Sequence, residues 1–198
     1  MTVRVSERRM SPSKGRSGIP YVLVILVATI TGCGAGLILL WVNPFHSPGP
    51  HIPKAEIPRH LPPDDIRALE GLYSRVASNR ADSCMYFTDA AGSGHVVTSA
   101  VPFLVGLLDD EEFVDWNFLR NYTPSERAAQ ALAYMGESGL VALLEASQSK
   151  TESIRYVAAS QLTRFWRDPR VVPTLKRLCG DKSRRIRTLV MSRLDNIK

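Results

Sequence analysis

The chain has 198 residues and carries 25 Lys and Arg against 19 Asp and Glu, a formal net charge of +6. Once a membrane span and two tails are set aside, this length allows one globular domain of about 100–140 residues. The three cysteines and four histidines form no CxxC pair or Cys/His cluster, and the sequence contains no nucleophile, base and acid set and no phosphate-binding loop. We therefore expect a protein that is not an enzyme and needs neither a metal ion nor another cofactor.

An apolar run near the N-terminus is the first predicted element. No charged side chain occurs between Arg16 and Lys54, and the 22 residues of 21–42 would span about 33 Å as a helix, enough to cross a bilayer. Five Lys and Arg precede the run and two follow it within twenty residues, which favours a cytoplasmic N-terminus. The sequence thus predicts a disordered basic cytoplasmic tail over 1–18 and a single-pass transmembrane signal anchor over 19–43, with the C-terminal domain extracytoplasmic.

The same run allows two other interpretations. Residues 30–33 resemble the lipobox of bacterial lipoproteins, in which lipidation of Cys33 would replace the span as the anchor. A cleaved secretory signal has an apolar core of only about 7–15 residues, whereas here the apolar character resumes after Gly36. All three interpretations place the domain outside the cytoplasm, and the length of the run favours the retained span.

Small residues recur at every fourth position of the run, at Ala28, Gly32 and Gly36. On a helix they would share one face, and such a stripe lets two membrane helices approach closely. A homodimer through the transmembrane helix is therefore one hypothesis. The other is that glycine is simply common in membrane helices.

A proline-rich segment follows the run. Seven prolines in 43–63 fix φ and remove amide donors, which predicts an extended linker over 44–63 that holds the domain off the membrane. The folded domain then occupies 64–198. Its first helix is predicted over 64–78, where acidic residues open an apolar helical period, and 79–99 is interpreted as a loop with room for one short helix.

The C-terminal half of the chain repeats itself. Two segments share a Val-Pro-x-Leu-x-x-Leu core, and helices of a second type align with periods of 30 and 32 residues on Leu132, Leu162 and Leu194. In two units a leucine precedes the helix-opening arginine, Arg155 or Arg187, by the same twelve residues. Repeated helix pairs stack because one pair cannot bury both of its apolar faces. The predicted fold class is therefore all-α, with a short α-solenoid of about three helix pairs after the transmembrane helix and the linker.

The pieces AAQALAYMG and DKSRRIR carry a family resemblance. An Ala-rich helix ending in Gly, a Pro-Leu helix ending in Asp and an Ile-Arg start to the next unit resemble the short HEAT repeats of bacteria, the group that includes the phycobilisome-lyase-like HEAT proteins. The resemblance covers Ala100–Lys198 and implies that Arg155 and Arg187 bond to loop carboxylates of adjacent units. The chain departs from the family pattern in an insert at Glu111–Pro124 and at Arg164–Arg170, where the family has glycine. A lyase-like enzyme acting on a tetrapyrrole is an alternative implied by the family name alone.

Most conspicuous residues of the repeats have a structural explanation. The repeat leucines are the predicted core, namely Leu104, Leu107, Leu132, Leu143, Leu162, Leu175, Leu178 and Leu194. Small side chains that let neighbouring helices approach are Ala128, Ala129, Ala131, Ala158 and Ala159. Cys84 and Cys179 could pair in an oxidising compartment, but an unpaired Cys179 on an apolar helix face is the interpretation that we favour.

Two features remain as candidate partner-binding sites. The first is the basic C-terminal cap, with candidate contacts at Lys176, Arg177, Arg184 and Arg185. A terminal repeat also needs a polar outer face, which is the alternative explanation. The second is the insert, where acidic residues lie beside the aromatic residues Trp116, Phe118 and Tyr122. These aromatics could instead plug the end of the solenoid.

Anchor, linker and repeats together predict a bacterial, membrane-anchored HEAT-repeat adaptor or scaffold. We expect it to bind an unknown protein partner on the extracytoplasmic side. A lipoprotein with the same domain is an alternative. Nucleic-acid binding through the basic cap would require a cytoplasmic domain, since an exported domain would rarely meet DNA.

Overall fold

A computed structural model describes residues 25–30, 35–40, 52, 56–116 and 120–195 of the chain. The chain divides into two compact units, Met1–His46 and Ser47–Lys198, and the second is called the helical domain below. The tail predicted over 1–18 lies outside the described residues.

The first unit contains a β-hairpin where a membrane-spanning helix was predicted. Strand β1 (Ile25–Ile30) pairs antiparallel with β2 (Ala35–Leu40) in the register Ile25↔Leu40 to Ile30↔Ala35. The described part of the predicted 19–43 helix is therefore extended. Length and hydropathy favoured a helix here. The residue types oppose one, because Val, Ile and Thr favour strands and Gly disfavours helices. Among the described residues, no helix is both long enough and apolar enough to cross a membrane.

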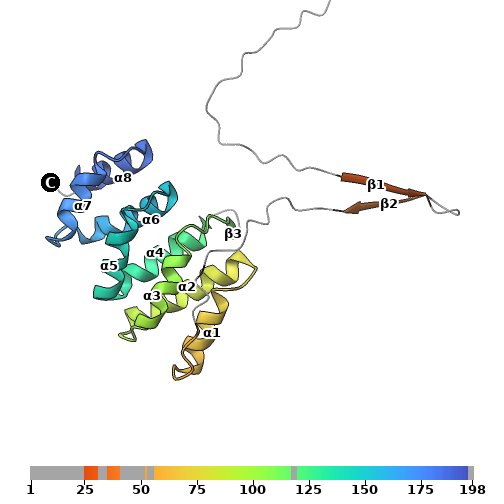
Figure 1. Cartoon of the computed structure of the whole chain (residues 1–198), viewed down its shortest axis with the longest axis horizontal. Coiled ribbons are helices and arrows are strands. Elements are labelled where there is room, and N and C mark those ends of the chain that lie inside the picture. Colours follow the sequence, from red (N-terminus) through yellow and green to blue (C-terminus); the bar gives the residue numbers. More distant parts are fainter. Residues whose placement is uncertain (1–24, 31–34, 41–51, 53–55, 117–119, 196–198) are drawn as a thin grey trace, which may run out of the picture. The chain divides into compact units, whose positions relative to one another are not determined.

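The helical domain contains eight described α-helices, and the seven that follow α1 lie in two rows (Figure 1). After α1 (Pro63–Gly71), the A row contains α2 (Ala77–Gly92), α4 (Pro124–Tyr134), α6 (Glu152–Leu162) and α8 (Arg184–Asp195). The B row contains α3 (Val101–Gly106), α5 (Gly136–Ala146) and α7 (Val171–Leu178). Short 3₁₀ turns at Thr98–Ala100 and Thr163–Phe165 join α2 to α3 and α6 to α7. We call α2 with α3 the first repeat, α4 with α5 the middle repeat and α6 with α7 the third repeat. This arrangement agrees with the predicted all-helical solenoid.

Local sequence sets the boundaries of the middle repeat. Helix α4 begins with a capping box, in which the Thr123 hydroxyl accepts from the Glu126 amide at 3.3 Å and the Glu126 carboxylate accepts from the Thr123 amide. Gly136 has a φ of +62°, which turns the chain sharply from α4 into α5. Gly139 then passes so close to α4 that a Cβ there would lie 1.8 Å from the Leu132 carbonyl oxygen. The two helices of this repeat therefore touch backbone to backbone.

The predicted leucine core is present in the helical domain. Seven of the eight leucines are 2 % exposed or less, and Leu194 is partly buried against the same core. The five predicted alanines are fully buried between A-row helices. The predicted linker contributes as well, because Ile52 is buried in this core and Ile57 and Leu61 pack against it. These three residues of the predicted linker therefore pack on the helical domain.

The N-terminal helices differ from their prediction. The helix expected over 64–78 ends at Gly71, and the segment expected as a loop is α2, with 16 residues the longest described helix. Its buried positions include Ala81, Cys84 and the charged Arg80, so an apolar period is hard to see in the sequence. Tertiary packing, and not an amphipathic pattern, fixes this helix.

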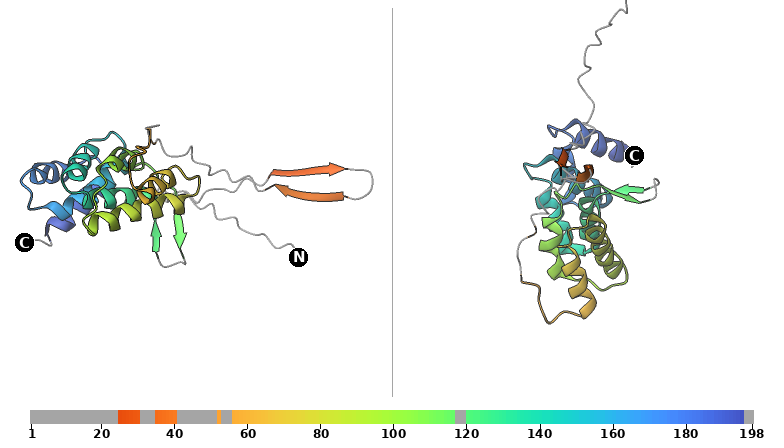
Figure 2. Two further views of the ribbon diagram at one scale, coloured as in Figure 1. Left: turned by 90° about the horizontal axis from the view of Figure 1, so that it is seen from below. Right: turned by 90° about the vertical axis from the view of Figure 1, so that its right-hand side faces the viewer.

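The insert forms a second hairpin. Strands β3 (Val114–Trp116) and β4 (Arg120–Tyr122) pair antiparallel in the register Val114↔Tyr122 to Trp116↔Arg120. Figure 2 shows this hairpin projecting from the side of the helices. Two strands alone are marginally stable in water. Packing of Val114 and Tyr122 on Ala77 and Ala81 of α2 holds its base.

Candidate functional site

An apolar row lies along the outer side of the B-row helices. These helices align on the buried Leu104, Leu143 and Leu175. The residue two positions before each leucine is exposed and apolar in all three helices, and these residues are Pro102, Val141 and Pro173. The same relative position on successive repeats forms a continuous line along a solenoid. We call this line the B-row stripe.

The residues that follow the aligned leucines change in character along the stack. The next position is Val105 in α3, Leu144 in α5 and Lys176 in α7. Val105 and Val141 are 39 and 41 % exposed, and Lys176 is also exposed. The surface beside the B-row stripe is therefore apolar along α3 and α5 and becomes basic at α7.

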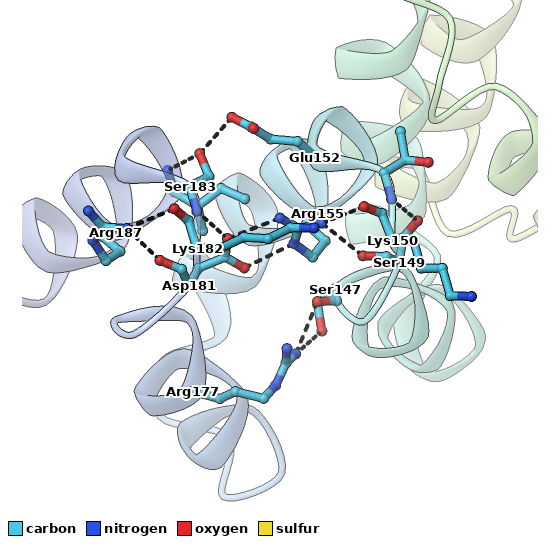
Figure 3. A network of polar contacts seen from close by, with 12 residues as sticks. Ser147, Ser149, Lys150, Glu152, Arg155, Arg177, Asp181, Lys182, Ser183 and Arg187 are labelled. Atoms are coloured by element: carbon cyan, nitrogen blue, oxygen red, sulfur yellow. Dashed lines mark hydrogen bonds and ion pairs between the residues drawn. The ribbon is translucent and has the colours of Figure 1, made fainter.

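A network of polar contacts holds the third repeat to α8 (Figure 3). Arg155 donates from Nε to Asp181 Oδ2 at 2.9 Å and from Nη2 to Asp181 Oδ1 at 3.0 Å, and both side chains are at most 6 % exposed. Its Nη1 donates to the carbonyl oxygens of Ser149 and Lys150. The guanidinium beside Asp181 lowers the pKa of that carboxyl below its usual 3.8. The prediction that Arg155 bonds to a loop carboxylate is confirmed.

Arg187 behaves differently from its prediction. Its Nη1 donates to the carbonyl oxygens of Asp181 and Lys182 at 2.6 and 3.0 Å, and no carboxylate contact is seen among the described residues. These carbonyls correspond to those that Arg155 binds, five and six residues before the arginine. Arg187 thus binds the two backbone carbonyls, as Arg155 does, but lacks the carboxylate partner within the described residues.

In the first repeat, Arg80 makes the same kind of contact as Arg155, with one guanidinium bound to a loop carboxylate and to a loop carbonyl. We call this contact the arginine clamp, and sequence reasoning missed it at Arg80. Its Nε and Nη2 donate to the Asp110 carboxylate at 2.6 and 3.1 Å, and its Nη1 donates to the Ser74 carbonyl. Nη2 also donates to Glu112. A signal was present, because Arg80 precedes Phe87 by seven residues as Arg155 precedes Leu162.

The middle repeat lacks both members of the clamp. Ser125 occupies the position of Arg155, seven residues before the aligned Leu132, and Ser149 occupies the position of Asp181. The loop geometry is nonetheless conserved within the molecule. Ser149 Oγ accepts from the amide two residues later, as the Asp181 carboxylate does. Removing both charges together leaves no buried charge unpaired.

The predicted basic contacts fall into two groups. Lys176 and Arg184 are exposed and make no ion pair within the described residues. Arg177 is exposed but donates to the carbonyl and hydroxyl of Ser147 at the end of α5. Arg185 lies over the Tyr156 ring, 3.6 Å from its centroid. The latter two are therefore partly committed to holding neighbouring repeats.

Of the three aromatic residues predicted as partner contacts in the insert, Tyr122 is buried and offers no free surface. This ring is 8 % exposed, packs in the base of the hairpin and lies under the Arg127 guanidinium at 4.4 Å. Tyr122 therefore has a structural role in the base of the hairpin, which differs from plugging the end of the solenoid. Trp116 lies in β3 but its side chain is outside the described set, as is all of Phe118. Among the described side chains of this region, Phe113 is exposed, at 60 %.

The predicted small-residue stripe of the apolar run is not formed in the hairpin. Ala28 lies in β1 opposite Leu37, whereas Gly36 lies in β2 opposite Thr29. A spacing of four aligns residues on a helix but not across two antiparallel strands. Gly32 and the candidate lipidation residue Cys33 lie outside the described residues.

A buried carboxylate joins α1 and α2. Asp65 is fully buried, accepts from the Tyr86 hydroxyl at 2.7 Å and lies 3.0 Å from His95 Nε2. This hydrogen bond, with some burial, raises the pKa of Tyr86 to about 12. Residues so far apart in sequence carry no local signal of this contact. Its geometry satisfies Asp65 and anchors α1.

The described residues contain no group of three His, Cys, Asp or Glu placed to hold a metal ion. Cys84 and Cys179 are both free thiols, with Cys84 buried and Cys179 partly buried. Burial raises the pKa of the Cys84 thiol, which makes it unreactive.

Comparison with known proteins finds a distant structural neighbour. No protein-family model matches the chain, and none of the curated proteins matches it. Among solved structures, the chain is similar to the complex of CpcE and CpcF of phycocyanin lyase from Nostoc sp. PCC7120, with 24% sequence identity and a TM-score of 0.41. The match covers 63% of this chain and 46% of the other, so the chain spans about half the length of the chain that it matches.

Proposed function

We propose that the helical domain is a protein-binding module whose docking surface is the B-row stripe. The observation that carries this proposal is the line of exposed apolar residues at equivalent positions of the three B-row helices, Pro102, Val141 and Pro173. An exposed apolar surface of this kind is typical of an interaction site. Its partner is a protein segment that presents apolar side chains to α3 and α5 and an acidic group to Lys176.

We further propose that the apolar run tethers this module to a membrane, with the helical domain on the extracytoplasmic side. The uncharged stretch between Arg16 and Lys54 and the basic residues before it support this proposal. A two-stranded hairpin leaves backbone groups on its outer edges unpaired, which is costly in a bilayer. The run is therefore proposed to become a helix when it enters lipid. Phosphatase and fluorescent-protein fusions at Lys198 test the orientation, and fluorescence without phosphatase activity would contradict it.

Site-specific photocrosslinking in cells tests the docking surface. A photoreactive residue replaces Val141 or Pro173 of the full chain in turn. The control replaces Thr151, which is exposed at the start of α6 and lies off the stripe. The proposal predicts one discrete adduct from both stripe positions and none from the control.

A substitution sharpens the same experiment. Val141→Glu places a charge in the middle of the stripe and is expected to reduce the adduct formed at position 173 by about tenfold or more. The matched change Thr151→Glu should leave it unaltered. Equal adducts from all three positions, or none from the stripe, would reject the B-row stripe as the docking surface.

A further inference from the structure

The two ends of the helical stack carry opposite charge. Residues 63–114, which form α1 to α3 and the loop after them, contain nine Asp and Glu against three Arg. Residues 164–195, which form the end of the third repeat and α8, contain ten Lys and Arg against three Asp. Figure 1 shows α1 and α8 at opposite ends of the stack.

At the acidic end, α2 exposes a face that inner helices bury. When α2 and α6 are aligned on Arg80 and Arg155, Asp82 occupies the position of Val157. Val157 is 4 % exposed, whereas Asp82 is exposed. Helix α1 covers part of this face, at Ser83 and at Tyr86, whose hydroxyl donates to Asp65. Beside it, Asp82 and Asp89 stay exposed on α2 and make this end of the stack acidic.

At the basic end, α8 exposes the opposite stacking face. Aligned on Arg155 and Arg187, Met191 occupies the position of the fully buried Ala159 and is 51 % exposed. Arg184 lies on the same side of α8 as Met191, seven residues earlier. The first turn of α8 contains no acidic residue, although positive charge opposes the helix dipole there. Local helix stability therefore does not explain Arg184.

We propose that the helical domain associates head to tail with a second copy of this chain, the α8 end of one copy docking on the α1 and α2 end of the next. The contact continues the stacking of A-row helices that already joins the repeats within one chain. Opposite charges at the two faces give the contact its direction and exclude head-to-head pairing. Neither Asp82 nor Arg184 forms an ion pair within the described part of its own chain, so both are available.

Such a contact is heterologous, because the two docking faces are different surfaces. It leaves a free face at each end of every dimer, and chains of copies grow as concentration rises. The charges lie at the surface, so added salt weakens the contact. Pairing through the apolar run would instead be closed and insensitive to salt.

Reversing the charge at each end in a separate variant, and then mixing the two variants, tests the proposal. The full chain in non-ionic detergent is examined by sedimentation velocity at about 20 mM salt, a concentration at which exposed charges are weakly screened. One variant reverses the basic end with Lys182→Glu and Arg184→Glu. A second reverses the acidic end with Asp82→Lys and Asp89→Lys, both exposed on α2. A control variant, Glu145→Lys with Gln148→Lys, changes exposed charge in the middle of the stack.

The expected results differ between the samples. The natural chain and the control associate, and each end variant alone associates at least about tenfold more weakly, because like charges then face each other. An equimolar mixture of the two end variants recovers association. A natural chain that sediments at one size at all concentrations overturns the proposal, as does association unaltered in both end variants. If only the basic-end variant loses association, the basic end binds something other than the acidic end of a second copy.

Discussion

Two regions of the helical domain, the arginine clamps between repeats and the α8 end, use their positive charges in opposite ways. Arg80 of α2 and Arg155 of α6 are almost completely buried, and each binds a loop carboxylate through two nitrogens. At the α8 end, Arg184 and Lys182 are exposed and bind no carboxylate within the described chain. The difference teaches that buried paired charge holds this stack together, whereas exposed unpaired charge is available for another molecule.

The largest effect is expected from breaking a clamp on one side. Asp181→Ala leaves the Arg155 guanidinium buried without its carboxylate, and we expect a loss of about 3 kcal/mol in the free energy of unfolding. Urea unfolding followed by circular dichroism measures it. Asp168→Ala is the matched control, because its partner Arg170 is half exposed and keeps its contact with Glu137. Equal losses of unfolding free energy in Asp181→Ala and Asp168→Ala would show that a buried ion pair stabilises the fold no more than an exposed one.

The middle repeat should depend on close packing instead of charge. Gly139→Ala places a Cβ against the Leu132 carbonyl, which forces α4 and α5 apart. We expect a loss of about 2 kcal/mol in unfolding free energy. Gly92→Ala is the control, since a Cβ there meets no atom within 4 Å. A stable Gly139→Ala variant would contradict the close approach of the two helices.

The serines of the middle repeat indicate that a clamp can be removed as a pair. The double variant Arg155→Ser with Asp181→Ser is expected to lose less stability than the sum of its single variants, with a coupling of about 1–3 kcal/mol. A double-mutant cycle in urea measures this coupling. Strict additivity would mean that the buried pair acts as two independent groups.

Acid should weaken the third repeat through the same pair. Because the folded pKa of Asp181 lies below its usual value, the contribution of this carboxylate is fully present above about pH 3.8 and is lost as the pH falls through the lowered pKa. Unfolding free energy measured from pH 5 to pH 2 should fall less steeply in the double serine variant than in the natural chain. Parallel curves would exclude Asp181 as a contributor.

The smallest effect on stability is expected at the exposed end. Lys182→Glu with Arg184→Glu should change the unfolding free energy by less than about 0.5 kcal/mol, and replacing a positive charge in the first turn of α8 favours the helix slightly. Thermal or urea unfolding checks this. A loss comparable to that of Asp181→Ala would place these residues among the structural charges.

Much of the repeat region could be predicted from sequence, for a physical reason. Leucines such as Leu132 and Leu162 recur at one spacing because each repeat buries the same face, so periodicity reports burial directly. The clamp at Arg155 was expected from the resemblance. Its counterpart at Arg80 was missed because α2 carries Cys84 and Phe87 where later helices carry alanine and leucine.

The remaining features depend on contacts that sequence does not display. The bond between Asp65 and Tyr86 joins residues 21 positions apart on two helices. The insert was seen as a departure, but its pairing as β3 and β4 and the burial of Tyr122 follow from packing on α2. In the apolar run, length favours a helix and Val and Ile content favours strands. The surrounding medium, lipid or water, decides between the two, and it is not written in the sequence.

One salt titration tests the contrast between the two regions most directly. Association and unfolding free energy of the full chain are measured in the same samples between about 20 and 500 mM salt, a range in which exposed charges become screened and buried pairs much less so. The account predicts that association weakens at least about tenfold while the unfolding free energy changes by less than about 1 kcal/mol. Association that does not respond to salt, or stability that falls together with it, would contradict the assignment of buried charge to the fold and exposed charge to binding.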